Sequence, residues 1–358
     1  MSSSISIGSL SLSVFGESHG KAIGAVIDNL PAGEELDLER IYGFMSRRAP
    51  KKDGTSTTRG ETDIPEIISG FYNGKTTGEA LCAVIKNNDQ HSSDYESISG
   101  LARPGHADYT GFLRYKGAND PRGGGHFSGR LTAPLVFLGA VCEQLLETRG
   151  VTVAAHIYSV GSEKDFPFDP INVSANLLRE VKTRYLPVLN PDADIKMRSI
   201  IDNARKSLDS MGGIIECCAV GFPAGFGSPI FDGIENRISQ LVFGIPAIKG
   251  IEFGAGFKVA EMTGSENNDE FFVENSEIKT KTNNAGGILG GISNGMPIIF
   301  RAAVKPTPSI ARSQNTVNFI KKENAVMEIK GRHDPCIVPR AVPCVEAAMN
   351  IALMSYFL

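Results

Sequence analysis

The segment LTAPLVFLGAVCEQLLE, residues 131–147, decides the fold assignment, because it carries the strongest helical signal in the chain. Its apolar residues recur at spacings of four, three, four and three, which places them on one helical face: Leu131, Leu135, Leu138, Cys142 and Leu145. Proline is tolerated only in the first turn of a helix. Pro134 therefore predicts that this helix begins close to the glycines that precede it.

Those glycines belong to the stretch RGGGHFSGR, residues 122–130. Backbone N–H groups of glycine approach an anion without interference from a Cβ atom, and a helix N-terminus adds a partial positive charge. Arg122 and Arg130 would add bidentate contacts to a phosphate or a carboxylate. For this motif taken alone, a glycine turn with solvated arginines remains the alternative.

Strands and helices alternate in both halves of the chain, which predicts two similar βα layers packed into one α+β domain, residues 1–358. Two polar stretches, 47–63 and 87–130, are interpreted as mobile loops. Apolar patterning predicts strands at 9–16, 64–72, 80–86, 151–159 and 212–221, and helices at 37–48, 173–184, 192–210 and 340–356.

The composition is that of a soluble globular protein, with 358 residues, 41% hydrophobic and 21% charged, and a net charge of −4. This balance gives no global attraction to nucleic acid or to an anionic membrane, so we expect neither as a partner. The apolar run 134–142 is too short to span a bilayer, and the first residues lack a basic leader. Six cysteines without Cys-x-x-Cys spacing indicate reduced thiols in a cytoplasmic protein.

Two other functions compete for this sequence. The stretch SGFYNGKTTG, 69–78, is similar to the phosphate loop of a nucleotide phosphotransferase, but three residues separate Gly70 from Gly74 where that loop needs four. We interpret it as a tight turn between strands. The basic stretch 47–59 would suit an anion-binding or RNA-binding module, which predicts salt-sensitive oligonucleotide binding. The histidines lack i, i+4 helical spacing, and we expect no metal.

Three short motifs carry side chains able to act as acids or bases. GESHG holds Ser18 and His19, RPGHADYTG places His106 close to Asp108, and GRHDPC holds Asp334 before a proline. Taken singly, each motif is equally compatible with a side chain that only braces a turn. His156 lies in an apolar strand and is expected to be a core residue.

Taken together, the residues of these motifs and their order along the chain resemble the chorismate synthase family over residues 7–356. Agreement across so many separated motifs is specific. The matching stretches are GESHG, TTRGETD, GKTTG, RPGHADYTG, RGGG, ILGGISNG, KPTPSI, GRHDPC and RAVP.

The resemblance implies a lyase of the shikimate pathway, in aromatic amino acid biosynthesis, that converts 5-enolpyruvylshikimate-3-phosphate to chorismate and phosphate by 1,4-elimination. It implies reduced FMN as the cofactor, without net redox change, and NADPH as a reductant. It also implies a β-α-β sandwich, with a helical layer between two antiparallel sheets, assembled as a homotetramer. Substrate and flavin would bring phosphates and carboxylates into one pocket, which requires several cations.

The same resemblance assigns catalytic and substrate-binding roles. His19, aided by Ser18, would protonate the departing phosphate, and His106 would stabilise the reduced flavin. Asp334 would assist proton removal at flavin N5, and Ser128 would join this catalytic group. The anionic groups of the substrate would be bound by Arg48, Arg103, Arg130 and Arg332, and Arg48 would also contact NADPH.

The resemblance places the cofactor against residues from four parts of the chain. They are His126, Phe127 and Ser128, then Pro246 and Ala247, then Gly290, and finally Lys305, Pro306, Thr307, Pro308, Ser309 and Arg332. Many family members read RGGGRSSAR where this chain has His126 and Phe127, so an arginine and a serine contact to FMN would be missing.

A second departure concerns the basic loop. Family members often carry an arginine where this chain has Gly54, and Lys51 and Lys52 would replace its charge but not its forked geometry. We therefore expect weak NADPH contacts at this loop. Since no reductase domain is evident in the sequence, an external flavin reductase is the expected source of reduced FMN.

Overall fold

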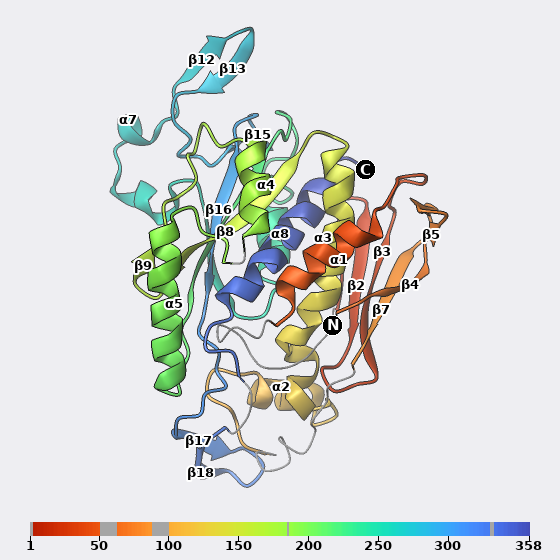
Figure 1. Cartoon of the computed structure of the whole chain (residues 1–358), viewed down its shortest axis with the longest axis vertical. Coiled ribbons are helices and arrows are strands. Elements are labelled where there is room, and N and C mark those ends of the chain that lie inside the picture. Colours follow the sequence, from red (N-terminus) through yellow and green to blue (C-terminus); the bar gives the residue numbers. More distant parts are fainter. Residues whose placement is uncertain (1–2, 51–62, 88–99, 185, 330–332) are drawn as a thin grey trace.

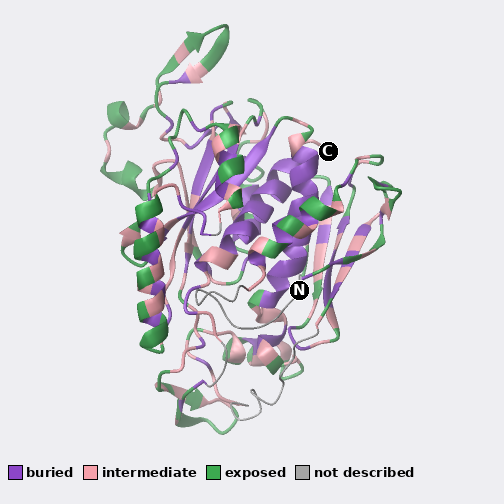
Figure 2. Cartoon of the chain, viewed as in Figure 1, coloured by how far each residue is buried: buried purple, intermediate pink, exposed green. Residues whose placement is uncertain are grey.

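The computed structural model describes residues 3–50, 63–87, 100–184, 186–329 and 333–358. Two five-stranded antiparallel sheets enclose a layer of helices, as Figure 1 shows. This is the α+β sandwich that the sequence predicted, and the fold class is confirmed. The most deeply buried residues lie on the central helices and on the sheet faces that contact them (Figure 2).

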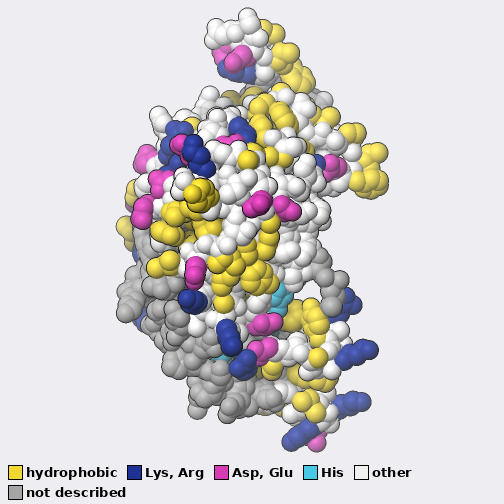
Figure 3. Space-filling model, turned by 90° about the vertical axis from the view of Figure 1, so that its right-hand side faces the viewer, with side chains coloured by type: hydrophobic (Ala, Val, Ile, Leu, Met, Phe, Trp, Pro, Cys, Tyr) yellow, Lys and Arg dark blue, Asp and Glu magenta, His cyan; other side chains and the backbone are white. Residues whose placement is uncertain are grey.

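The first sheet is built from the N-terminal quarter of the chain. Leu10 and Leu12 are buried while Ser11 and Ser13 face outward, as expected for a strand with one face on the core. Hydrophobic side chains gather in the middle of the outward side, with few charged ones among them (Figure 3). In spatial order its strands are β1 (Ser4–Ile7), β2 (Leu10–Gly16), β3 (Ala22–Asp28), β7 (Leu81–Lys86) and β4 (Glu66–Ser69).

The second sheet comes from residues 152–304 and is also antiparallel. Its middle strands are largely buried on both faces, because helices and chain segments cover both sides. In spatial order the strands are β11 (Ile248–Phe253), β16 (Ile298–Val304), β10 (Gly213–Val220), β8 (Thr152–Val160) and β9 (Glu163–Lys164).

The helical layer is dominated by α3 (Thr132–Glu147) and α8 (Val338–Met354), which pack against each other. A Cβ atom on Gly139 would lie 2.2 Å from the Cβ atom of Ala347, so glycine is required for this close approach. Pro134 lies in the first turn of α3, as predicted. Among the described residues, only 129–147 are long and apolar enough to span a membrane, and 94% of that window is buried inside the protein.

Four further helices pack around this pair or on the second sheet. Helix α1 (Leu38–Arg48) packs on α3 and α8, with Asp37 capping its N-terminus. Helix α6 (Ile234–Val242) packs on α8, and α4 (Ala175–Thr183) lies on β8. The long helix α5 (Pro191–Lys206) contacts β8 and β9 from outside.

Short elements form the loops and projections around this body. The pair β5 (Phe71–Tyr72) and β6 (Lys75–Thr76) turns at Asn73 and Gly74, so the tight turn predicted within SGFYNGKTTG is confirmed. The others are the pairs β12 (Phe271–Glu274) with β13 (Glu277–Thr280), β14 (Ile288–Leu289) with β15 (Ile292–Ser293), and β17 (Gln314–Asn318) with β18 (Glu323–Met327), and helix α7 (Gly264–Asn267).

One expectation about the loops was wrong. Residues 108–115, inside the stretch interpreted as a mobile loop, form helix α2 (Asp108–Tyr115). The ring of Phe127 lies over Gly111 of this helix, where a Cβ atom would come within 2.6 Å of it. Packing of this kind stabilises a helix of eight residues, which is too short to be stable by itself. Residues 51–62 and 88–99, which include Lys51, Lys52 and Gly54, lie outside the described residues.

Candidate active site

A cavity of about 1070 Å³ lies where the C-terminal end of α1 meets the N-terminal ends of α3 and α8. Two helix N-termini at its wall favour negative charge in the cavity. Its cationic lining residues are Arg48, Arg103, Arg130, Lys249, Lys305 and Arg340, whereas Asp334 is its one acidic lining residue among those described. The cavity is therefore suited to an anionic ligand.

The glycine run in RGGGHFSGR brings the two predicted catalytic histidines together. Gly123, Gly124 and Gly125 have φ angles of 60°, 84° and 53°, which glycine adopts without strain. A Cβ atom on Gly123 would lie 2.4 Å from the His19 ring, and one on Gly124 would lie 3.1 Å from the His106 ring. The imidazoles thus contact adjacent glycines of one loop.

These two histidines differ in their access to the cavity. His106 and Gly123 line it, whereas His19 and Ser18 are buried beside Gly123 and are absent from its lining. The backbone N–H of Ser18 donates to the Gly125 carbonyl at 3.1 Å, which fixes the GESHG turn against the glycine loop. Any proton transfer from His19 therefore has to occur at the Gly123 edge of the cavity.

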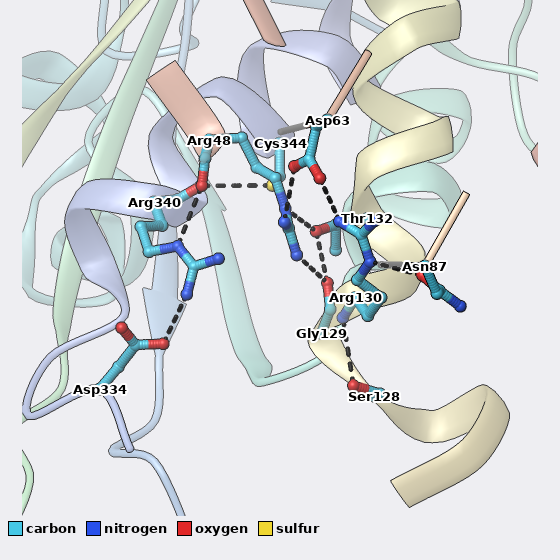
Figure 4. A network of polar contacts seen from close by, with 10 residues as sticks. All are labelled: Arg48, Asp63, Asn87, Ser128, Gly129, Arg130, Thr132, Asp334, Arg340 and Cys344. Atoms are coloured by element: carbon cyan, nitrogen blue, oxygen red, sulfur yellow. Dashed lines mark hydrogen bonds and ion pairs between the residues drawn. The ribbon is translucent and has the colours of Figure 1, made fainter. Parts of the chain in front are cut away.

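Asp63, which the sequence did not single out, joins two of the predicted substrate-binding arginines (Figure 4). Arg48 Nη1 donates to Asp63 Oδ2 at 2.9 Å, and Arg130 Nη1 donates to Asp63 Oδ1. Arg48 also donates from Nε to Thr132 Oγ1 at 3.1 Å and from Nη2 to the Gly129 carbonyl at 2.9 Å. Burial would raise the pKa of Asp63, but the two guanidinium groups lower it.

A second carboxylate, Asp108, holds Arg103 and His106. Arg103 donates to Asp108 from Nε at 2.7 Å and from Nη2 at 2.6 Å, and the Nδ1 atom of His106 lies 2.9 Å from Asp108 Oδ1. Burial would raise the pKa of Asp108, but hydrogen bonds from Arg103 and His106 lower it well below its usual range. Asp108 contacts Nδ1, and the Nε2 side of the ring faces Gly124.

Asp334 lines the cavity and is held by Arg340. Arg340 is the first residue of the RAVP stretch, and no role was predicted for it. Arg340 Nη1 donates to Asp334 Oδ2 at 2.7 Å, and its Nε donates to the backbone carbonyl of Arg48 at 2.9 Å (Figure 4). The guanidinium therefore connects the start of α8 to the end of α1. Arg332, predicted to bind substrate and cofactor, lies outside the described residues.

Most of the predicted cofactor contacts lie on the same cavity. Gly290, on the turn between β14 and β15, and Pro306 do not line it. The residues that do are His126, Phe127, Ser128, Pro246, Ala247, Lys305, Thr307, Pro308 and Ser309.

His126 and Phe127 have contacts of their own within the chain. The Nδ1 atom of His126 lies 2.8 Å from the Gly16 carbonyl oxygen and its Nε2 atom 2.9 Å from Ser3 Oγ. Phe127 packs on α2. The two residues that depart from RGGGRSSAR therefore tie the glycine loop to the first sheet and to α2.

The segment 305–309 offers groups suited to a phosphorylated ligand. Lys305 Nζ donates to the Gly105 carbonyl, and burial together with nearby Lys249 lowers the pKa of Lys305. The buried Thr307 Oγ1 atom has no hydrogen-bond partner among the described residues. Buried hydroxyl groups are normally paired, so this one is available to a ligand. In the described part of the chain, no group of three or more His, Cys, Asp or Glu residues could hold a metal ion.

Comparison with known proteins gives a consistent result. A family model described as chorismate synthase matches residues 10–358. A chorismate synthase of Dehalococcoides mccartyi is 45% identical over 345 residues, covering 95% of this chain and 92% of that protein. One of Korarchaeum cryptofilum is 44% identical over 352 residues, covering 98% and 96%. A crystal structure of a chorismate synthase aligns with a TM-score of 0.77 at 29% identity, covering 98% of this chain and 91% of that one.

Proposed function

Because this chain belongs to the chorismate synthase family, we propose that it converts 5-enolpyruvylshikimate-3-phosphate to chorismate and phosphate by a 1,4-elimination that requires reduced FMN. Family membership supports the chorismate-forming reaction of aromatic amino acid biosynthesis. The lyase mechanism and the flavin requirement rest on the chemistry of the cavity. The observation that carries them is the convergence of Arg48, Arg103, Arg130 and His106 on one cavity.

The cavity fits a flavin mononucleotide next to a phosphorylated substrate. Its volume of about 1070 Å³ exceeds that of most small-molecule sites. Apolar walls that include Leu135, Ile245 and Ile337 would face a flat ring system. We expect the cofactor to be held by Ser128, Pro246, Ala247, Lys305, Thr307, Pro308 and Ser309, with Phe127 and His126 at its edge.

Reduced FMN would supply electron density to the substrate ring and recover it, so the reaction has no net redox change. The chain's own residues would bind, orient and protonate. Arg48, Arg103 and Arg130 would neutralise the phosphate and carboxylates of the substrate. His106, held through Nδ1 by Asp108, would present Nε2 to the bound ligands.

Proton transfer is assigned to two further groups. His19, with Ser18, would donate a proton to the departing phosphate at the Gly123 edge of the cavity. Asp334, held by Arg340, would be the carboxylate that accepts a proton. Ser128 Oγ accepts the N–H of Arg130, so it would orient that arginine as well as contact the cofactor.

The wider setting is proposed on the same basis. We expect a homotetramer in the cytoplasm that takes reduced FMN from an external flavin reductase. NADPH, if it contacts Arg48, would bind weakly, because Gly54 stands where family members often carry a second arginine in the basic loop. Nucleic acid and membranes are not expected as partners.

An anaerobic assay tests this function. The purified protein is mixed with 5-enolpyruvylshikimate-3-phosphate and either chemically reduced FMN, oxidised FMN, or oxidised FMN with NADPH, and chorismate and phosphate are measured. We expect equal amounts of chorismate and phosphate with reduced FMN and little product in the other two mixtures. Absence of chorismate with reduced FMN would contradict the proposal. Full activity with oxidised FMN and NADPH would contradict the expectation that an external reductase supplies the reduced flavin.

A further inference from the structure

We propose that Asp63 is a positioning residue that aligns Arg48 and Arg130 for an anionic group of the ligand. The inference rests on the proposed function, since it concerns the same cavity. The family resemblance implies no role for Asp63. Its contacts with the two arginines are drawn in Figure 4.

The three side chains of this cluster come from separate parts of the chain. Arg48 ends α1, Arg130 lies just before α3, and Asp63 follows residues 51–62 in the chain. Separate elements thus bring two cations to the two oxygens of one carboxylate. The Asp63 side chain is 2% exposed and each arginine side chain 6% exposed, so solvent barely reaches the pairs.

Asp63 contacts the two arginines from the side that faces away from the cavity. Arg48 and Arg130 line the cavity, whereas Asp63 does not. The carboxylate therefore approaches the guanidinium groups from behind, while other parts of them face the cavity. Held in this way, a guanidinium keeps one orientation beside the cavity and loses less rotational freedom when a ligand binds.

The single negative charge of Asp63 is shared between two guanidinium groups. Neutral groups also accept hydrogen bonds from these arginines: Thr132 and the Gly129 carbonyl from Arg48, and Asn87 from Arg130 at 3.1 Å. An anion at the cavity face would be attracted by both guanidinium groups.

Two roles for Asp63 predict opposite results for Asp63→Asn. If the carboxylate only screens charge, its removal adds one positive charge beside the cavity, and anion binding becomes tighter. If it positions the arginines, its removal lets both guanidinium groups turn, and binding becomes weaker. We expect the second result, with kcat/KM lowered by about 10²-fold, the scale of a small misplacement of binding groups.

The experiment measures binding of inorganic phosphate and of 5-enolpyruvylshikimate-3-phosphate by calorimetry, together with KM and kcat. It compares wild-type protein with Asp63→Asn, Asp63→Glu and Asp202→Asn. Asp202 is a matched control, because its carboxylate also bridges two cations, Arg205 and Lys206, on the outer face of α5. Asp63→Glu keeps the charge but moves the carboxylate by one methylene group, so it remains informative if Asp63→Asn does not fold.

Weaker binding of both anions by Asp63→Asn and Asp63→Glu, with wild-type behaviour of Asp202→Asn, would support the proposal. Unchanged or tighter binding by either Asp63 variant would overturn it. If the wild-type protein binds phosphate but makes no chorismate, the proposed function fails while the phosphate data still decide the role of Asp63. If the wild-type protein binds neither anion, both fail.

Discussion

Two clusters of buried charged residues lie in different parts of this molecule and are built differently. The cavity cluster consists of Arg48, Asp63 and Arg130. The sheet cluster consists of His156, Asp165, Glu216 and Arg301, next to the central strands of the second sheet. Comparing them shows how burial of charge for binding differs from burial of charge for structure.

The sheet cluster is closed. The His156 ring lies 3.1 Å from Asp165 Oδ2 and 3.0 Å from Glu216 Oε2, and Arg301 donates to Glu216 Oε1 at 2.8 Å. With His156 protonated, two cations meet Asp165 and Glu216, and Arg301 Nη1 also lies 3.5 Å from Glu252 Oε1. Backbone N–H groups of Phe168, Leu189 and Asn190 complete the hydrogen bonding of the acids. Such a cluster contributes to the folded state and offers no charge to a ligand.

The cavity cluster is open. Its two arginines line a cavity of about 1070 Å³, where a ligand can reach them. The difference teaches that charged groups at a cavity wall, rather than burial itself, indicate the functional site. The predictions below separate the two clusters by their effects on turnover and on stability.

The largest expected effect is on turnover, when the cavity histidine His106 is replaced. His106→Ala should lower kcat by about 10²-fold or more, the scale of a lost acid–base group, with little change in the free energy of unfolding. Steady-state assays with reduced FMN and urea unfolding measure the two quantities. The same loss of turnover is expected for His19→Ala, and wild-type turnover in both variants would remove their assigned roles.

The matched replacement in the sheet cluster should do the reverse. His156→Ala leaves the buried Asp165 without its cation and removes one of the two cations that contact Glu216, so the free energy of unfolding should fall by about 3–5 kcal/mol. Turnover per folded molecule should stay close to that of the wild type, since no member of this cluster lines the cavity. A variant that is fully stable but inactive would show that the two clusters are not separable.

A smaller effect is expected when one arginine in each cluster becomes lysine. Arg48→Lys keeps the charge but loses the fork that donates to Asp63, Thr132 and Gly129, so KM should rise about tenfold, the value of a hydrogen bond to a charged group. Arg301→Lys should leave KM unchanged. Equal effects of the two variants on KM would contradict the assignment of Arg48 to the ligand.

The smallest effect is a pH dependence of stability on the alkaline side. Burial would lower the pKa of His156, but its hydrogen bonds to Asp165 and Glu216 raise it above its ordinary value of 6.5. The resulting stabilisation is complete below the unfolded-state pKa and is lost as pH rises through the higher folded-state pKa. Urea unfolding from pH 6 to pH 9 should show this loss in the wild type and not in His156→Gln.

Much of the fold could be predicted from the sequence, because the long core elements carry regular apolar patterns. The helix expected at 340–356 is α8, Val338–Met354, and the strand expected at 212–221 is β10, Gly213–Val220. His156 is a core residue, as predicted, with 0% of its surface exposed. Helix α2 was missed because it has only eight residues, contains Gly111 and lies within a polar stretch, so its stability comes from packing on Phe127 rather than from its own sequence.

The candidate site was predictable only as a set of motifs. The resemblance to a family predicted that His106, Arg48 and Arg130 share one site, and in the structure these side chains line one cavity. Asp63 was not identified, because an aspartate that lies 67 residues from Arg130 gives no local sign of its partner. Arg340 was overlooked for the same reason, since its contacts with Asp334 and Arg48 depend on the docking of α8 beside α1.

A crystal structure of the protein with FMN and 5-enolpyruvylshikimate-3-phosphate tests the central claim most directly. The account predicts both ligands in the cavity between α1, α3 and α8, with an anionic group of the substrate bound by Arg48 and Arg130. It also predicts a ligand hydrogen bond to Thr307 Oγ1. Ligand density elsewhere on the molecule, with these two arginines bound only to protein groups, would contradict it.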